Sequence, residues 1–156
     1  MIETLRRLKN SPYDLYFVFT SQEEVGLRGA KTAAFAIEPE IALAVDVTDT
    51  GDVPDCEYMA VKLGEGPAVK IKDSSVISHQ WVCQWMKEAA IRAKIPYQLE
   101  VLTAGGTDAG AVHTTKGGVL TGAISVPCRY MHTTVESVDK HDLENAIGLL
   151  CEILSN

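Results

Sequence analysis

Cysteine is scarce in this 156-residue chain, which has four, and no two of them form a CxxC pair. A thiolate zinc site and a thioredoxin-like redox centre therefore have no support. A disulfide framework is also not expected, because a chain of this length can bury an adequate apolar core. Cys83 and Cys151 fall on apolar faces of predicted helices, where a free cysteine packs as a small hydrophobic residue.

Positive charge is limited as well: 14 Lys and Arg stand against 21 Asp and Glu, a net charge of −7. The only basic cluster is Arg6-Arg7 with Lys9, which is typical of the solvated face of a helix. Proteins that bind nucleic acid carry a basic footprint, so nucleic acid is not an expected partner. An acidic protein is also repelled by an anionic membrane surface.

Long apolar runs and nucleotide-binding motifs are missing too. The sequence has no stretch of roughly 18 apolar residues that could span a membrane, and residues 1–9 lack the apolar run of a signal peptide. Neither GxxxxGK[ST] nor GxGxxG occurs, which disfavours a nucleotide-binding domain built on Gly105-Gly106. We expect a cytoplasmic protein with no membrane partner.

The composition that is present fits one globular domain over residues 1–156. The hydrophobic fraction is 46% and the charged fraction 22%, which are ordinary values for such a domain. Strand-like and helix-like patterns alternate along the chain. Helices are predicted over 2–8, 26–37, 79–94, a short stretch between 105 and 118, and 139–154; strands over 15–20, 41–47, 68–71 (at an edge), 97–102 and 119–126; and a loop over 48–66.

Alternating strands and helices imply βαβ units, and the nearly continuous apolar strands imply burial on both faces. The predicted fold class is therefore α/β, a three-layer α/β/α arrangement with a mostly parallel sheet. Ser78 is the expected N-cap of the third long helix and Asp139 that of the last. Trp81 and Trp85 are expected in the core. So are one face of residues 2–8 (Ile2, Leu5 and Leu8) and one face of the last helix (Leu143, Ala146, Ile147, Leu150 and Leu154).

Acidic side chains and one histidine follow the predicted strands. In open α/β sheets, ligands bind beyond the carboxyl ends of the strands. The first strand leads into Glu23-Glu24, the second ends at Asp46, another leads into Thr107-Asp108, and the next leads toward His132. Carboxylates with an imidazole form a ligand set suited to Zn²⁺, Co²⁺ or Mn²⁺. Past a strand end, one glutamate can bind a metal while its neighbour acts as a base.

Each of these signals taken alone has a simpler interpretation. Glu23-Glu24 also fits a solvated turn, and Asp46 a loop-capping aspartate. Gly105-Gly106-Thr107-Asp108 fits an anion-binding helix start or a tight turn. His132 fits an exposed loop histidine. The other three histidines are expected to be structural or surface residues: His79, His113 and His141.

Taken together and in order, five strings resemble a known family. They are Thr20-Ser21-Gln22-Glu23-Glu24-Val25-Gly26-Leu27-Arg28-Gly29-Ala30; Ala44-Val45-Asp46-Val47-Thr48 followed by Gly51-Asp52-Val53-Pro54; Gly64-Glu65-Gly66-Pro67; Gly105-Gly106-Thr107-Asp108-Ala109; and Ile124-Ser125-Val126-Pro127-Cys128-Arg129-Tyr130-Met131-His132-Thr133. The chain resembles the two-metal aminopeptidases of the glutamyl, deblocking and tetrahedral type, which are sometimes labelled endoglucanase or cellulase. The resemblance covers essentially the whole sequence and implies a phosphorylase/hydrolase-like metallopeptidase domain.

The resemblance implies a role for each matching residue. Glu23 is similar to the general base, Glu24 and His132 to the ligands of one metal, and Asp46 to a ligand of the other. The two divalent ions would be Zn or Co. Thr107 and Asp108 match a motif near the substrate pocket, where they would orient the amino end of a peptide substrate or brace the site.

The sequence also departs from the family pattern. Members carry two more ligands upstream, a histidine and a bridging aspartate, together with an inserted dimerisation domain. None of these has a counterpart in the sequence, so we expect a C-terminal portion of the catalytic domain. That portion would expose an apolar patch and be weakly active or inactive, whereas the complete protein would be a homo-oligomer. The alternative is a short, non-catalytic relative that acts as a binding or assembly module.

Overall fold

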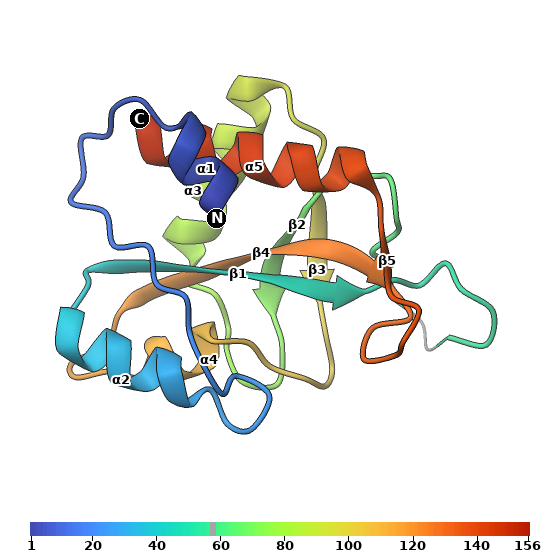
Figure 1. Cartoon of the computed structure of the whole chain (residues 1–156), viewed down its shortest axis with the longest axis horizontal. Coiled ribbons are helices and arrows are strands. Elements are labelled where there is room, and N and C mark those ends of the chain that lie inside the picture. The colour runs from blue at the N-terminus through green and yellow to red at the C-terminus, as the bar shows by residue number, and fades with distance from the viewer. Residues whose placement is uncertain (57–58) are drawn as a thin grey trace.

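A five-stranded mixed sheet separates two layers of helices (Figure 1). The structure is a computed structural model that describes residues 1–56 and 59–156; residues 57–58 of the predicted loop 48–66 lie outside the described residues. The elements are α1 (Ile2–Arg7), α2 (Arg28–Ile37), β1 (Ile41–Asp49), β2 (Ala68–Lys72), α3 (Gln80–Ala93), β3 (Gln98–Val101), α4 (Ala109–Val112), β4 (Leu120–Arg129), β5 (Ser137–Val138) and α5 (Lys140–Ser155).

The strand order is β1-β4-β2-β3, and β5 pairs with the end of β4. β1 runs parallel to β4 along its whole length, and β2 runs parallel to β3. β4 meets β2 and β5 in antiparallel pairs. The three-layer α/β/α prediction is confirmed. The position of β2 was predicted wrongly, since it lies inside the sheet and not at an edge: an apolar run predicts a buried strand but not its neighbours.

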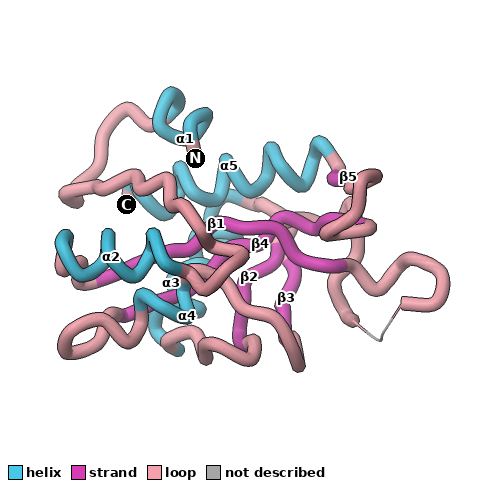
Figure 2. Tube along the Cα trace, turned by 60° about the horizontal axis from the view of Figure 1, so that its bottom comes forward, coloured by secondary structure: helices cyan, strands magenta, loops and turns pink. Residues whose placement is uncertain are grey.

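Helices α1, α3 and α5 cover one face of the sheet, and α2 and α4 cover the other (Figures 1 and 2). The main core lies on the first face, where Met86 of α3 and Leu149 of α5 are fully buried with Ile124 of β4. Close packing of α3 on β4 depends on Gly122, because a Cβ there would lie 2.7 Å from Val82 Cγ1. None of the helices in the described part of the chain combines the length and apolar character needed to cross a bilayer.

Two helix starts differ in their capping. Asp139 caps α5 as predicted, since its carboxylate accepts the backbone N–H of His141 at 2.6 Å. Ser78 does not cap α3. The helix begins one residue later, and the ring Nδ1 of His79 accepts the N–H of Trp81 at 3.3 Å.

Several apolar positions predicted in the core are exposed. Trp81 is 50% exposed and stacks on Trp85, and Leu143 is 43% exposed; each lies in the first turn of its helix. Ile2 and Leu5 of α1 are also exposed, because the packing partner of this short helix is α5 alone among the described elements. Cys83 is buried and Cys151 half-buried, as expected, and burial raises the pKa of both thiols.

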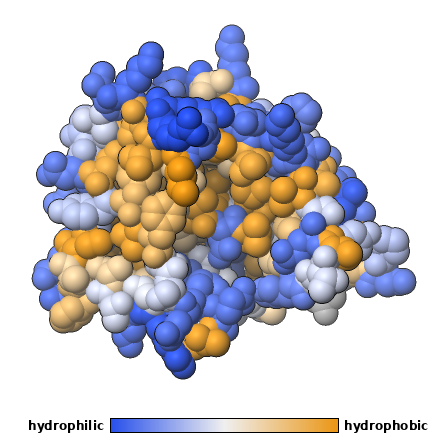
Figure 3. All heavy atoms as spheres, in the orientation of Figure 1, coloured by the Kyte–Doolittle hydropathy of each residue, from blue (hydrophilic) through white to orange (hydrophobic). Residues whose placement is uncertain are grey.

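Residues 15–20, predicted as a buried strand, form no strand in the structure. This apolar, β-branched and aromatic run pairs with no other strand in the described part of the chain, and Tyr16 and Phe19 are 68% and 63% exposed. The segment borders a cavity of about 860 Å³ that β1, α2 and the end of α5 also line. Apolar atoms gather across the corresponding face in Figure 3. Residue pattern predicts an extended chain, but only a neighbouring strand makes it part of a sheet.

Candidate active site

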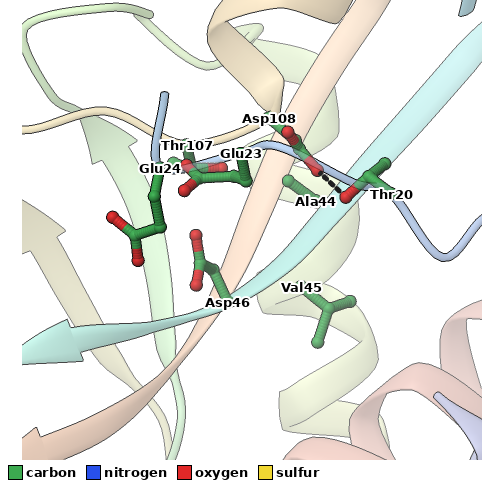
Figure 4. Close-up of a pocket in the computed structure, with 8 residues that line it drawn as sticks. All are labelled: Thr20, Glu23, Glu24, Ala44, Val45, Asp46, Thr107 and Asp108. Carbon is green, nitrogen blue, oxygen red and sulfur yellow. Dashed lines mark hydrogen bonds between the residues drawn. The ribbon is translucent and has the colours of Figure 1, made fainter. Parts of the chain in front are cut away.

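An acidic pocket of about 250 Å³ lies where the turn after residue 20, the strand β1 and the loop before α4 meet. In Figure 4 the carboxylates of Glu23, Glu24 and Asp46 approach one space from different sides. The pocket is lined by Thr20, Glu23, Glu24, Ala44, Val45, Asp46, Thr107 and Asp108. Five of the six residues singled out from the sequence therefore lie around one cavity, and His132 reaches it through Glu24.

The start of α2 holds the turn that carries the two glutamates. The carbonyl oxygen of Glu23 accepts the N–H groups of Gly26 and Leu27 at 3.0 and 2.9 Å, and that of Ser21 accepts the N–H of Gly29 at 2.9 Å. A Cβ on Gly29 would lie 2.5 Å from the backbone nitrogen of Ser21. Only glycine therefore permits this close approach of helix and turn.

Asp46 projects from β1, and its Oδ1 accepts the N–H of Val47 at 2.8 Å. Its neighbour in register on β4 is Ser125. Alternate residues of a strand share a face, so Asp46 lies on the same face as Ala44, which packs against the small core beside α4. The strand thus delivers Asp46, half-buried, to the pocket.

Glu24 and His132 contact each other, with 3.2 Å between Glu24 Oε1 and His132 Nε2. The backbone N–H of His132 donates to Glu136 at 2.6 Å. Both segments are sharply bent: Gln22 has φ +58°, Tyr130 +59° and His132 +61°. Left-handed backbone costs a non-glycine residue about 1–2 kcal/mol, and such residues concentrate at functional sites.

The Gly105–Asp108 loop supplies the opposite wall. Thr20 Oγ1 donates to Asp108 Oδ2 at 2.6 Å, which Figure 4 shows as a dashed line. Asp108 Oδ1 is buried and has no hydrogen-bond partner among the described residues. Thr107 is buried, and its Oγ1 accepts the N–H of Ala109 at 3.3 Å. Thr20 therefore holds one oxygen of Asp108 in place, whereas the buried second oxygen is unsatisfied among the described residues.

Negative charge concentrates in the pocket. Burial raises the pKa of Glu23, and repulsion from Asp46, Glu24 and Asp108 raises it further, while His132 acts in the opposite direction. Burial also raises the pKa of Asp46, against the hydrogen bond from Val47, and Asp108 adds to the increase. A cation bound among these groups would relieve the repulsion.

The donors have the chemistry of a divalent-metal site, but not a complete set. Carboxylate oxygens and an imidazole nitrogen suit Zn²⁺ and Co²⁺. Within residues 1–56 and 59–156, no three His, Cys, Asp or Glu side chains form a group that could hold a metal ion. Around this pocket the described residues thus offer one close donor pair, Glu24 with His132, and Asp46 separately.

Two residues beside the pocket were missed from the sequence. Thr20 donates a hydrogen bond to Asp108, and the sequence indicated it only through its position at the start of the string that contains Glu23-Glu24. Lys70 is 2% exposed, and its signal was a lone charge within the apolar run 68–71. The remaining histidines do not line the pocket, as expected: His79 caps α3, and His113 and His141 contact Ala109 and Asp139.

Comparison with known proteins agrees with the fold. The model of the M42 glutamyl aminopeptidase family matches residues 1–149. A protein of Acetivibrio thermocellus named as an aminopeptidase is 54% identical over 154 residues, which cover 99% of this chain and 47% of that protein. Among solved structures, aminopeptidase APDkam598 from the archaeon Desulfurococcus kamchatkensis has a TM-score of 0.96 and 43% identity, over 99% of this chain and 45% of its own.

A second solved structure is the Pyrococcus horikoshii TET1 peptidase, described as able to assemble into a tetrahedron or a large octahedral shell. It has a TM-score of 0.74 and 35% identity, over 88% of this chain and 40% of its own. These neighbours define an α/β peptidase fold. The chain belongs to the M42 glutamyl aminopeptidase family, and it spans about half the length of the relatives it matches.

Proposed function

We propose that this chain provides part of the active site of a metal-dependent aminopeptidase, which hydrolyses N-terminal residues from peptides. The observation that carries the proposal is the placement of Glu23. Its carboxylate is partly buried beside Asp46 and Asp108, and it adjoins the Glu24–His132 pair.

Glu23 is the proposed general base and acid. It accepts a proton from the attacking water and returns it to the nitrogen of the leaving amine. Glu24 and His132 would hold one divalent ion, Zn or Co, and Asp46 would hold the other. Such ions, when bound, lower the pKa of water and polarise the peptide carbonyl.

Asp108 is the proposed site for the amino end of the substrate. Its Oδ1 is buried without a partner among the described residues, whereas Thr20 fixes Oδ2. The free oxygen would accept a hydrogen bond from the α-ammonium group of a peptide. Thr107 would brace the loop through Ala109.

The remaining ligands, a histidine and a bridging aspartate, would come from the part of the protein that corresponds to the unmatched half of the relatives. The chain alone would then bind metal weakly and turn over little substrate. We propose that the complete protein is a homo-oligomer, as the TET1 peptidase is. A cytoplasmic location stays a prediction, which fractionation of producing cells would test.

A hybrid enzyme tests the proposal. The matching 47% of the Acetivibrio thermocellus relative is replaced by this chain, and release of chromogenic product from aminoacyl p-nitroanilides is measured with added Zn²⁺ or Co²⁺. We expect turnover in the hybrid and a loss of about 100-fold or more in Glu23→Gln. Glu65→Gln, an exposed glutamate outside the pocket, is the matched control. An active hybrid that tolerates Glu23→Gln would contradict the proposal.

A non-catalytic binding or assembly module is the second candidate. The observation that favours it is that no three donors converge among the described residues. This candidate predicts an inactive hybrid together with measurable binding of a short peptide to the chain in the absence of metal. Isothermal titration with a tripeptide, and with the same peptide acetylated at its N-terminus, would show whether Asp108 takes the amino group.

A further inference from the structure

A buried polar cluster beneath the pocket joins all four main strands of the sheet. Glu100 of β3 lies at its centre, fully buried. One carboxylate oxygen pairs with the ammonium of Lys70 on β2 and accepts a hydrogen bond from Thr48 of β1 at 2.9 Å. The other accepts a hydrogen bond from Ser125 of β4 at 2.5 Å. None of these four residues lines the pocket.

Global stability is a poor explanation for charges in this position. Removing an ammonium and a carboxylate from water carries a large desolvation cost, and apolar side chains of similar volume often stabilise a core equally well. A buried ion pair at the centre of a polar cluster that spans four strands is therefore better explained by the groups that it orients. Lys70 also lies near a second carboxylate, and the contacts of that carboxylate show which part of the structure the pair orients.

The second partner is Asp73, just beyond the end of β2. Its Oδ2 lies 3.4 Å from Lys70 Nζ and has no hydrogen-bond partner among the described residues. Its Oδ1 accepts three hydrogen bonds from the following turn, two from Ser75 at 2.7 and 2.8 Å and one from the N–H of Val76 at 2.9 Å. The turn over residues 73–76 is thus built around a carboxylate that the lysine holds.

That turn is the support of the loop that carries Asp108. Ser74 donates a hydrogen bond to the carbonyl oxygen of Gly105. A Cβ on Gly106 would lie 3.0 Å from Ser75 Oγ, and one on Gly110 would overlap the Ser75 side chain. The two glycines therefore permit direct contact between the turn and both sides of the Thr107-Asp108 segment.

We propose that Lys70 is a positioning residue, which acts through Asp73 and the 73–76 turn to hold the Gly105–Asp108 loop against the pocket. Lys70 does not touch the substrate in this scheme. The structural part stands by itself, whereas its effect on hydrolysis rests on the proposed function.

Hydrogen–deuterium exchange on the chain tests the structural part. The reporters are the amides of Gly110, Ala111 and Val112, which donate to the carbonyl oxygens of Thr107 and Asp108. The double variant Lys70→Met with Glu100→Gln removes both charges of the pair and leaves Asp73 without its cation. We expect exchange in the 105–112 segment to become at least about tenfold faster. The control, Leu149→Ala, weakens the core on the opposite face and should leave the ratio of local to global exchange unchanged.

Asp73→Asn provides a second variant if the double variant fails to fold. An asparagine keeps the Oδ1 acceptor for Ser75 and Val76 but loses the ion pair with Lys70. It should accelerate exchange in the same segment. Unchanged exchange in the folded double variant or in Asp73→Asn overturns the proposal, whatever the activity.

The kinetic arm uses the hybrid enzyme. In Asp73→Asn, misplacement of Asp108 should raise KM for the p-nitroanilide by at least about fivefold. The control Leu149→Ala, measured at a temperature where it is folded, should keep KM unchanged. A hybrid without any turnover, combined with faster loop exchange, counts against the proposed function but supports the structural role of Lys70. A fall in kcat alone, with KM unchanged, contradicts the positioning of Asp108.

Discussion

Glu24 and His132 lie 108 positions apart in the chain, yet Glu24 Oε1 is 3.2 Å from His132 Nε2. Both side chains are largely exposed, at 72% and 65%. An exposed side-chain contact contributes little to stability, so the contact itself does not account for the left-handed backbone at Gln22 and His132. The bends are consistent with the proposal that these two side chains bind one ion.

Removal of one member of this pair should weaken metal binding. We expect His132→Ala to raise the dissociation constant for Zn²⁺ in the hybrid enzyme by about tenfold or more, since even groups that only orient a ligand affect affinity by 10- to 100-fold. Isothermal titration measures the constant. His141→Ala is the matched control, because His141 is also exposed and also lies 3.2 Å from a carboxylate. Equal effects of the two substitutions would refute the assignment of His132.

The turn that carries Glu23 and Glu24 should not tolerate an added methyl group at Gly29. Gly29→Ala places a Cβ about where the backbone of Ser21 lies, so the start of α2 must move away from the turn. In an ordinary helix position alanine stabilises relative to glycine by about 1 kcal/mol, and here we expect a lower melting temperature and at least tenfold lower kcat/KM in the hybrid. Gly148→Ala is the control. Gly148 lies in the middle of α5, where an added Cβ would be 3.2 Å from Ile95 Cδ1, a looser contact than that at Gly29. A more stable Gly29→Ala protein would argue against a fixed turn.

The layers could be predicted from the sequence because they depend on local pattern. Apolar runs and 3.6-residue periodicity defined β1, α3 and α5. Glu23, Asp46 and Asp108 do line one pocket, as expected, but not for the expected reason alone: residues 15–20 form no strand, and Asp46 lies within β1, which continues to Asp49. Partners distant in the chain carry no such pattern. The antiparallel contact of β2 with β4, the lack of a strand partner for residues 15–20 among the described residues, and the pairing of Lys70 with Glu100 all depend on such contacts.

Asp142 illustrates the same limit within a helix. It lies in the first turn of α5, and its carboxylate is fully buried and accepts the N–H groups of Gly64 and Gly66, distant in the chain, each at 2.7 Å. Asp142→Ala would leave these donors unpaired, so we expect the free energy of unfolding to fall by about 2–3 kcal/mol. Urea denaturation measures the change. Asp142→Asn keeps one acceptor and should cost less; an equal loss in both variants would mean that the cost arises elsewhere.

The Asp52–Arg129 ion pair should make stability depend on pH. Arg129 donates to both carboxylate oxygens, at 3.1 and 2.6 Å, and holds the pKa of Asp52 well below its ordinary value of about 3.9. Because the folded state binds this proton more weakly than the unfolded state, the pair stabilises above about pH 4 and loses its effect as the pH falls below that value. We expect Asp52→Asn to lower the melting temperature by about 2 °C at pH 7 and to have a smaller effect at pH 3.

Thermal unfolding followed by circular dichroism at both pH values gives this difference. The exposed Asp14→Asn serves as the control and should leave the melting temperature unchanged at each. An Asp52→Asn effect that is as large at pH 3 as at pH 7 would show that the carboxylate acts through its shape and not through its charge.

The apolar face bordered by residues 12–20 should drive self-association. The cavity of about 860 Å³ between this segment, β1 and α2 is lined by Tyr16 and Phe19, which are 68% and 63% exposed. Exposed apolar surface of this kind promotes contact between molecules, so light scattering should show a mass that rises with protein concentration. Tyr16→Ser with Phe19→Ser should move the equilibrium toward the monomer, whereas Ile91→Ser, equally exposed at 64% but away from the cavity, should not. A monodisperse monomer at all concentrations would contradict the prediction.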